Sequence, residues 1–257
     1  MCSILKKLKI YLKLNISINI KYIIHWDCLF KERYPITLLQ MSDKKSDDKK
    51  SDTKRGKVYI GSMIMRGKWA EVPDEIDNYI KVNVTSAQRK DSLYRRDFSP
   101  MTLYPYRGFC CFENFWQSGK RYQGVDDEKV IAWWKKQEKG RRRCVIGKGK
   151  KVTHAEWEDF DNIKLQYIES RKKIYVPLYE ELVKTREMII KLNNILDTGV
   201  SVILFDFDGP FQNNKPIVEE VTLELLENKI NDIRRPFGHG YVISVILSGI
   251  CHSQYTS

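Results

Sequence analysis

The stretch that decides how this chain is interpreted is Phe112-Glu113-Asn114-Phe115-Trp116-Gln117-Ser118-Gly119-Lys120. If it is helical, Glu113, Gln117 and Lys120 share one face, because residues at i, i+4 and i+7 lie above one another. The aromatic residues at positions 112, 115 and 116 can then anchor the opposite side in a core. Such a polar stripe on a rigid helix suits a small catalytic pocket. The alternative is a surface helix whose glutamate and lysine are simply solvated.

This block follows Phe98-Ser99-Pro100 and a turn through Pro105 and Gly108. Together, Phe98-Ser99, the run 113–117 and Lys120 resemble the signature of the NADAR superfamily, in which a Phe-Ser strand or loop precedes a helix with Glu, an aromatic residue, Gln and Lys. The resemblance covers this block well and residues 56–250 loosely. Asn114 stands where the family often has His, so no role of that histidine is carried over.

The resemblance implies an α+β fold over residues 56–257, a single helix-rich domain around a few short strands. It also implies an N-glycosidase, without metal or organic cofactor, that acts on a ribosylated or ADP-ribosylated small molecule or nucleobase. Nucleic acid that carries such a modification is a substrate for some members. The alternative is a non-catalytic protein that binds nucleotide, ADP-ribose or nucleic acid. Later segments also resemble proteins of large DNA viruses and phages, which implies no activity.

Cleavage of an N-glycosidic bond builds positive charge on the ribosyl ring. On the resemblance, Glu113 is the key carboxylate, which stabilises that charge or orients water. Gln117 and Lys120 position the substrate, and Trp116 packs or stacks against it. Phe98 and Ser99 complete this part of the predicted substrate-binding set.

A second acidic group, Asp206-Phe207-Asp208-Gly209, follows the buried-strand run 200–205. Strand alternation would send Asp206 and Asp208 to one side and Phe207 to the other, so both carboxylates are candidates for the pocket of Glu113. Asp-Gly-Pro also favours a plain turn. The motif resembles the first motif of haloacid-dehalogenase-type phosphatases, but only 49 residues follow Asp208, too few for the later elements of that fold.

A third candidate, Gly238-His239-Gly240, opens the last expected helix. Glycines let the backbone approach a ligand closely, and amides at a helix start favour phosphate. His239 would contact that phosphate or transfer a proton, and a histidine in a surface turn is the alternative. NADAR-like proteins also have a Gly-rich segment near the C-terminus, which places all three residues in the predicted substrate-binding set. The segments 85–88 and 170–173 carry no specific signal and are interpreted as capping or ligand-adjacent.

The formal net charge of +12 suggests a nucleic-acid partner, but its distribution weakens that interpretation. Residues 1–55 hold 13 Lys and Arg against 6 Asp and Glu, which leaves a surplus of only 5 for the other 202 residues. An ordinary solvated surface accounts for that surplus. Residues 141–151 are interpreted as an exposed basic loop that either binds phosphate or nucleic acid or is simply solvated. The nearby Trp133 and Trp134 suit either base stacking or a core.

The N-terminal 55 residues are expected to be a basic, disordered leader, because the run 42–57 is almost entirely Ser, Asp and Lys. Translation from Met41 is one interpretation of the first 40 residues. The apolar run 14–24 is interrupted by Lys and Asn, so no membrane span is expected, and no secretory cleavage site follows. Six cysteines without a Cys-x-x-Cys pair indicate reduced thiols and no structural zinc. We therefore expect a cytoplasmic protein, in the host cytoplasm if it is viral.

Periodicity and turn signals place the remaining elements. We expect short strands at 58–60 and 79–84 and a buried strand at 200–205. Helices are expected from Asp126 or Asp127 to Gly140, from Pro177 to a closing Gly199, over 216–230 and over 241–250. Residues 63–69 fit either loop or strand, and no internal repeat is present.

Overall fold

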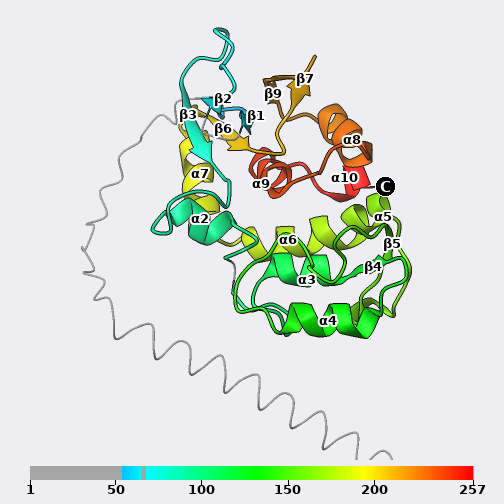
Figure 1. The fold of residues 1–257 in the computed structure, drawn as a ribbon. Helices are drawn as coiled ribbons and strands as arrows, with labels where there is room; N and C mark the ends of the chain where they lie inside the picture. The colour runs from blue at the N-terminus through cyan, green and yellow to red at the C-terminus, as the bar shows by residue number, and fades with distance from the viewer. Residues whose placement is uncertain (1–53, 65–67, 103, 257) are drawn as a thin grey trace, which may run out of the picture. The chain divides into compact units, whose positions relative to one another are not determined.

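The computed structural model describes residues 54–64, 68–102 and 104–256. The interpretation of Met41 as the start lies outside the described residues, as does nearly all of the predicted disordered leader. The described part has an α+β fold with one mixed sheet, two small two-stranded ribbons and a larger number of helices (Figure 1). The predicted fold class is confirmed.

The main sheet has the strand order β2-β1-β6-β3, and β9 also pairs with β1. Both β1 and β3 run parallel to β6, while β2 and β9 run antiparallel to β1. The bounds of these strands are β1 Val58–Ile64, β2 Lys68–Trp69, β3 Tyr79–Asn83, β6 Ser201–Asp206 and β9 Val218–Glu220.

Strand β6 is buried along its whole length, as its run of apolar residues predicts for a strand inside a sheet covered on both faces. Burial of each large apolar side chain stabilises the fold by about 1.5–3 kcal/mol. The register pairs Ser62 with Asp206 and Asn83 with Phe205, so the carboxyl ends of the three parallel strands meet at one edge. Ligands of open parallel sheets bind outside such an edge, which makes it the first place to look for a site.

Three helices pack beside the sheet: two of them contact its strands, and the third contacts one of these helices. Helix α9 (His239–Ser248) contacts β1, β6 and α7 (Glu187–Asp197), and α7 contacts α2 (Leu93–Phe98). Helix α9 is buried at eight of its residues, so it forms a central part of the core. Two further helices, α8 (Leu223–Asn231) and α10 (Ser253–Thr256), pack together near the C-terminal end, and β7 (Phe211–Gln212) and β8 (Lys215–Pro216) form a hairpin.

A second group of elements carries the decisive stretch of sequence. In Figure 1 this group, coloured green, lies below the sheet, and α6 (Val176–Val183) and α9 lie between the two. The group consists of α3 Phe112–Ser118, β4 Lys120–Tyr122, α4 Asp127–Lys135, β5 Val152–Ala155, the 3-10 helix Glu158–Phe160, α5 Tyr167–Ser170 and the π-helix Arg171–Tyr175. Strands β4 and β5 pair antiparallel.

Aromatic rings hold α3 in this group. Phe112 is fully buried, with its ring centroid 5.6 Å from those of Tyr175 and Tyr179. The ring centroids of Phe115 and Trp157 lie 6.1 Å apart, and the two rings are stacked. The prediction that positions 112, 115 and 116 anchor the helix in a core is therefore confirmed. Trp134 is fully buried and Trp133 partly so, as the core interpretation of that pair requires.

All four predicted helices have different bounds in the structure. The helix expected over 241–250 is α9, which begins two residues earlier and ends at Ser248. The helix expected over 177–199 is two helices, because Asp97 accepts a hydrogen bond from the main chain of Met188 at 3.1 Å and caps a new start at α7. The helix expected over 216–230 begins only at Leu223, since Val218–Glu220 pairs with β1 and Thr222 caps α8. The helix capped by Asp126 ends at Lys135, short of Gly140.

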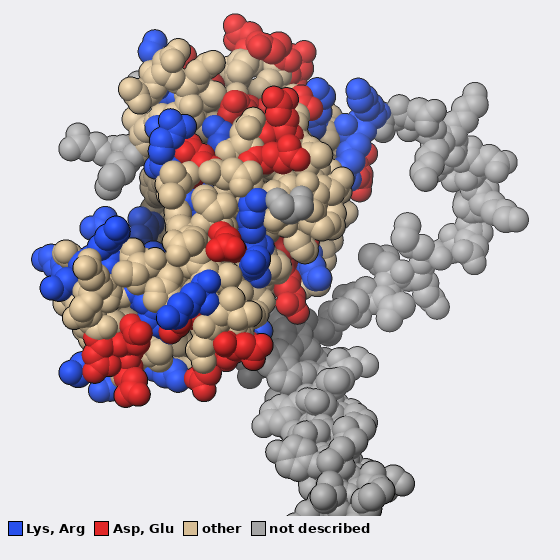
Figure 2. Space-filling model, turned by 90° about the vertical axis from the view of Figure 1, so that its right-hand side faces the viewer, with Lys and Arg blue, Asp and Glu red and all other residues tan. Residues whose placement is uncertain are grey.

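Charge is mixed over the surface. Figure 2 shows basic and acidic side chains interspersed on the face that it presents. The expected basic loop is confirmed as exposed at Arg141, Arg142, Arg143, Lys148, Lys150 and Lys151. The four described cysteines are free thiols. Within the described ranges, no helix has both the length and the apolar character needed to cross a membrane.

Candidate active site

A cavity of about 340 Å³ opens at the carboxyl edge of β6, between this edge, α3 and the start of α9. Eight of the predicted site residues line it: Glu113, Trp116, Gln117, Lys120, Asp206, Asp208, Gly238 and His239. The cavity thus joins the three candidate motifs, which are separated by up to about half of the chain. Phe98, Ser99 and Gly240 do not line it.

Helix α3 presents Glu113 and Gln117 to the cavity from one face, as their spacing predicts. Gln117 Nε2 donates to Glu113 Oε1 at 2.8 Å, and the Glu113 main chain donates to the carbonyl of Pro100 at 2.9 Å. Lys120 reaches the same cavity by another route. The helix ends at Ser118, so Lys120 lies at the start of β4 and the prediction that it shares the helix face is wrong.

Glu113 and Lys120 lie in surroundings that disfavour their charged forms. Burial raises the pKa of Glu113, while Gln117, Lys120, His239 and Arg142 act in the opposite direction. Burial lowers the pKa of Lys120, and only Glu113 opposes that shift. Carboxyl and ammonium groups whose pKa values are both shifted toward neutrality are typical of functional sites.

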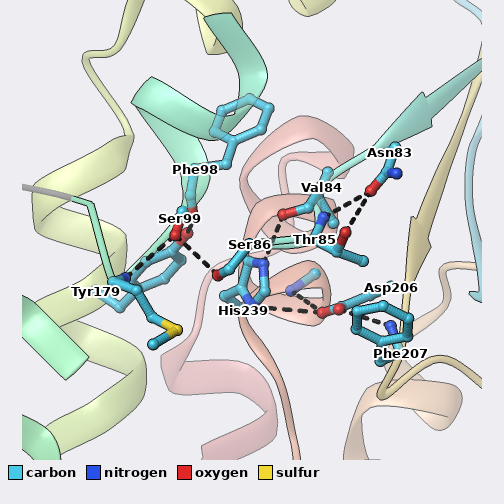
Figure 3. A network of polar contacts seen from close by, with 12 residues as sticks. Asn83, Val84, Thr85, Ser86, Phe98, Ser99, Tyr179, Asp206, Phe207 and His239 are labelled. Atoms are coloured by element: carbon cyan, nitrogen blue, oxygen red, sulfur yellow. Dashed lines mark hydrogen bonds and ion pairs between the residues drawn. The ribbon is translucent and has the colours of Figure 1, made fainter. Parts of the chain in front are cut away.

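Asp206 is nearly fully buried at the end of β6, and both of its oxygens are bonded within the chain. Oδ1 accepts from the main chain of Phe207 at 2.7 Å, and Oδ2 accepts from the main chain of Gly240 at 3.0 Å (Figure 3). A Cβ on Gly240 would approach Asp206 Oδ2 to 2.8 Å, so a glycine is needed there. Gly240 therefore allows α9 to pack closely against Asp206, and it does not line the cavity.

Asp208 follows in the turn closed by the hydrogen bond from Gly209 N to Asp206 O at 3.2 Å. The turn interpretation is thus correct, and both carboxylates still line the cavity. Phe207 lines it too, because β6 ends at Asp206 and strand alternation no longer applies. Burial and the neighbouring Asp206 raise the pKa of Asp208 to about 6, against the effects of His239 and Arg142.

His239 is buried, so the interpretation as a surface histidine is wrong. Its Nε2 lies 2.7 Å from the carbonyl oxygen of Val84, and its Nδ1 lies 3.5 Å from Asp206 Oδ2 (Figure 3). A carbonyl oxygen only accepts hydrogen bonds, so Nε2 carries a proton. The ring is therefore fixed between β3 and β6 with one edge toward the cavity.

Phe98 and Ser99 lie behind the lining. Phe98 is fully buried at the end of α2, in a helix rather than in the strand or loop that the resemblance implies. Ser99 is also fully buried and donates to the hydroxyl of Ser86 at 2.8 Å (Figure 3). Ser86 does line the cavity. Ser99 therefore supports a residue of the cavity lining and does not itself belong to that lining.

Arg142 also lines the cavity, from the basic loop for which the sequence left phosphate binding open as one interpretation. Asn114 fixes that loop: it is fully buried, donates to Lys139 O at 3.1 Å and accepts from Arg141 N at 2.8 Å. The position that departs from the resembled family thus holds the segment that brings a cation to the site. No periodicity signals such a contact, because it joins residues 25 and 27 positions apart.

Arg171 and Tyr175 line the cavity as well, although neither was predicted and 170–173 was interpreted only as capping or ligand-adjacent. They come from the π-helix, whose bulge no sequence pattern indicates. The guanidinium of Arg171 is buried and donates to the carbonyls of Asp232 at 3.0 Å and Arg235 at 2.6 Å. The ring of Tyr167 covers it at 4.0 Å. Arg171 therefore joins the cavity wall to the segment before α9.

In the part of the chain that the structure describes, no group of three or more His, Cys, Asp or Glu side chains is arranged to hold a metal ion. The cavity is lined by two carboxyl groups with raised pKa values, an ammonium group, guanidinium groups and aromatic rings. Comparisons of the chain with protein-family models, with curated proteins and with solved structures found no significant match.

Proposed function

We propose that this protein is an N-glycosidase that hydrolyses the N-glycosidic bond of a ribosylated or ADP-ribosylated substrate. The observation that carries the proposal is one cavity in which Glu113 and Asp208, with pKa values raised by burial, lie beside Lys120 and Arg142. Its volume of about 340 Å³ falls within the range of about 300–1,000 Å³ typical of small-molecule sites. The NADAR resemblance of the α3 stretch supports the same reaction.

In this proposal, Glu113 is the carboxylate that acts on the ribosyl carbon. As the bond to nitrogen lengthens, positive charge develops on the ring, and a fixed anion in a poorly solvated cavity stabilises it. Glu113 then accepts the proton of the attacking water, whose oxygen forms the new bond to the anomeric carbon. Gln117 keeps the carboxylate oriented through its 2.8 Å hydrogen bond.

Asp208 is suited to the leaving group. The electron pair of the broken bond goes to the base nitrogen, which takes up a proton as it departs. A carboxyl group with a pKa of about 6 is protonated in mildly acidic solution and can supply that proton. Asp206 acts through its neighbours, because its oxygens hold Gly240 and face His239.

Lys120 and Arg142 are suited to bind an anionic substituent of the ribose. Both line the cavity, and phosphate is the anion that such cationic side chains bind in ribosyl compounds. A phosphorylated or ADP-ribosyl substrate therefore fits better than an uncharged nucleoside.

The test is incubation of the protein with an ADP-ribosylated guanine oligonucleotide, free ADP-ribose and aminopyrimidine ribosyl phosphates, with mass spectrometry of the products. Glu113→Gln is the inactive variant, and Glu128→Gln, at an exposed position of α4, is the matched control. Release of a free base by the native protein and by Glu128→Gln, but not by Glu113→Gln, supports the proposal. Binding without release would instead favour a non-catalytic recognition protein, and release by Glu113→Gln at the native rate would contradict the assigned role.

A further inference from the structure

A second cavity, of about 350 Å³, lies beside the first. Both are lined by Trp116, Lys120 and Tyr167, so the two cavities adjoin at these three side chains. The rest of the second cavity comes chiefly from β5 and from Trp157. The proposed hydrolysis does not use any of these additional residues.

The two cavities differ in charge. Three carboxylates line the first one: Glu113, Asp206 and Asp208. No acidic residue is among those that line the second, and its one Lys or Arg side chain is the shared Lys120. Its walls contain the aromatic rings of Trp116, Trp157 and Tyr167 instead. A neutral, flat group would be better accommodated there than an anion or a cation.

Apolar side chains at this cavity are left in contact with solvent. Val152 is 43% exposed, Ile233 is 69% exposed and Tyr167 is 39% exposed. All three line the second cavity, although they come from different parts of the chain. Exposed apolar groups gathered at a hollow are typical of a binding site, because a ligand removes their surface from water.

We propose that the second cavity binds the aromatic heterocyclic base of the substrate, while the first binds its ribosyl phosphate. This inference rests on the proposed function. Lys120, one of the three shared side chains, lines the first cavity together with Glu113. A bond that joins the two halves of the substrate would therefore pass beside Glu113, where the ribosyl carbon must lie to react.

Polar groups in the second cavity can orient the base. Thr153 Oγ1 and His154 Nδ1 lie 2.9 Å apart, and His154 Nε2 lies 3.4 Å from a carboxylate oxygen of Glu156. Thr153 and His154 line the cavity together with Gln166. Both ring nitrogens of His154 are thus paired within the chain. The hydroxyl of Thr153 and the amide of Gln166 supply donors and acceptors that match the mixed edge of a heterocycle.

Isothermal titration calorimetry with two probes tests this inference. The first is formycin 5′-monophosphate, a C-nucleotide whose base and ribose are joined by a carbon–carbon bond, so that cleavage cannot interfere. The second is ribose 5-phosphate, which lacks a base. The variants are Val152→Asp and Ile233→Asp in the second cavity, and Ile190→Asp, at an apolar residue of α7 that is 55% exposed and lines neither cavity, is the control. Two cavity variants keep the test valid if one of them fails to fold.

We expect the native protein and Ile190→Asp to bind the C-nucleotide at least about tenfold more tightly than ribose 5-phosphate, since stacking of one base contributes about 1–3 kcal/mol. Val152→Asp and Ile233→Asp should lose most of that difference and keep the affinity for ribose 5-phosphate. Equal affinity for both probes in the native protein, or an unchanged difference in the cavity variants, would overturn the inference. Because these are binding measurements, they fail independently of base release, which tests the proposed function.

Discussion

The two walls of the candidate active site are built differently. On the wall of β6 and α9, the oxygens of Asp206 accept main-chain hydrogen bonds at 2.7 and 3.0 Å, and His239 is held by the carbonyl of Val84 at 2.7 Å. On the wall of α3 and β4, burial shifts the pKa of Glu113 upward and that of Lys120 downward. The first wall satisfies Asp206 and His239 within the chain. The second wall, and Asp208 in the turn after β6, keep charges that the fold does not fully stabilise.

This difference separates scaffold from chemistry. A buried polar group that has all its partners in the chain rigidifies the fold. A buried charge without full compensation costs stability, and it persists where a ligand or a reaction uses it. We therefore assign the positioning of the site to Asp206 and the reaction to Glu113 and Asp208. Each of the following experiments breaks or sharpens that division.

The largest effect on stability is expected for Asp206→Ala. The change leaves the main-chain N–H groups of Phe207 and Gly240 without their acceptor, so the free energy of unfolding should fall by about 3 kcal/mol. Urea unfolding followed by circular dichroism measures it, with the exposed Asp74→Ala as control. A loss of stability no larger than that of the control would show that Asp206 is not a scaffold residue.

A smaller loss is expected for Asn114→Ala. This change removes the side chain that bonds to Lys139 and Arg141, so two main-chain groups lose their partner at a cost of about 2 kcal/mol. The loop that carries Arg142 is then no longer fixed, and the affinity for ribose 5-phosphate should also fall. Asn228→Ala, on the exposed face of α8, is the matched control. Unchanged affinity would separate Asn114 from the site.

The pH dependence of base release tests the role of Asp208. Burial and Asp206 raise its pKa from an ordinary value of 3.8 to about 6, so the acid is protonated below that pH and ionised above it. If the protonated form acts, kcat/KM should fall by about tenfold per pH unit above this pKa. Asp208→Asn should be slow and should lack this decline. A native profile that rises through the same range would assign Asp208 the opposite role.

The smallest effect is expected for Gln117→Ala. Its hydrogen bond to Glu113 lowers the pKa of that carboxyl group, so removing it raises the pKa. Because Glu113 acts as the ionised form, the acidic limb of the pH profile should move to higher pH. Gln123→Ala, exposed in the turn after β4, should leave the limb in place. A shift to lower pH would contradict the charge state assigned to Glu113.

Much of the fold could be predicted where the signal is local. The apolar run 200–205 predicts β6 to within a residue at each end, and the Gly-His-Gly turn marks the start of α9. The break between α6 and α7 could not be predicted, because it depends on a cap that Asp97 supplies from another helix. Local periodicity does not reveal caps of this kind.

The candidate site divides in the same way. The spacing of Glu113 and Gln117 predicts their contact, and the strand end predicts that Asp206 and Asp208 lie at the sheet edge. Arg142 lies in a run of basic residues whose composition fits solvation as well as phosphate binding, and its place in the site depends on a buried contact of Asn114. The acidic groups of the site lie in motifs that the sequence reveals, whereas most of its cationic side chains lie in segments without a specific motif.

The most direct test of the central claim measures turnover and stability in the same preparations of Glu113→Gln and of its control Glu128→Gln. We predict that Glu113→Gln lowers kcat/KM for base release by at least about 100-fold, while its free energy of unfolding stays within about 1 kcal/mol of the native value or rises. The control should match the native protein in both. Native turnover in Glu113→Gln, or a loss of turnover that only follows a loss of folded protein, would contradict the assignment of Glu113 to the reaction.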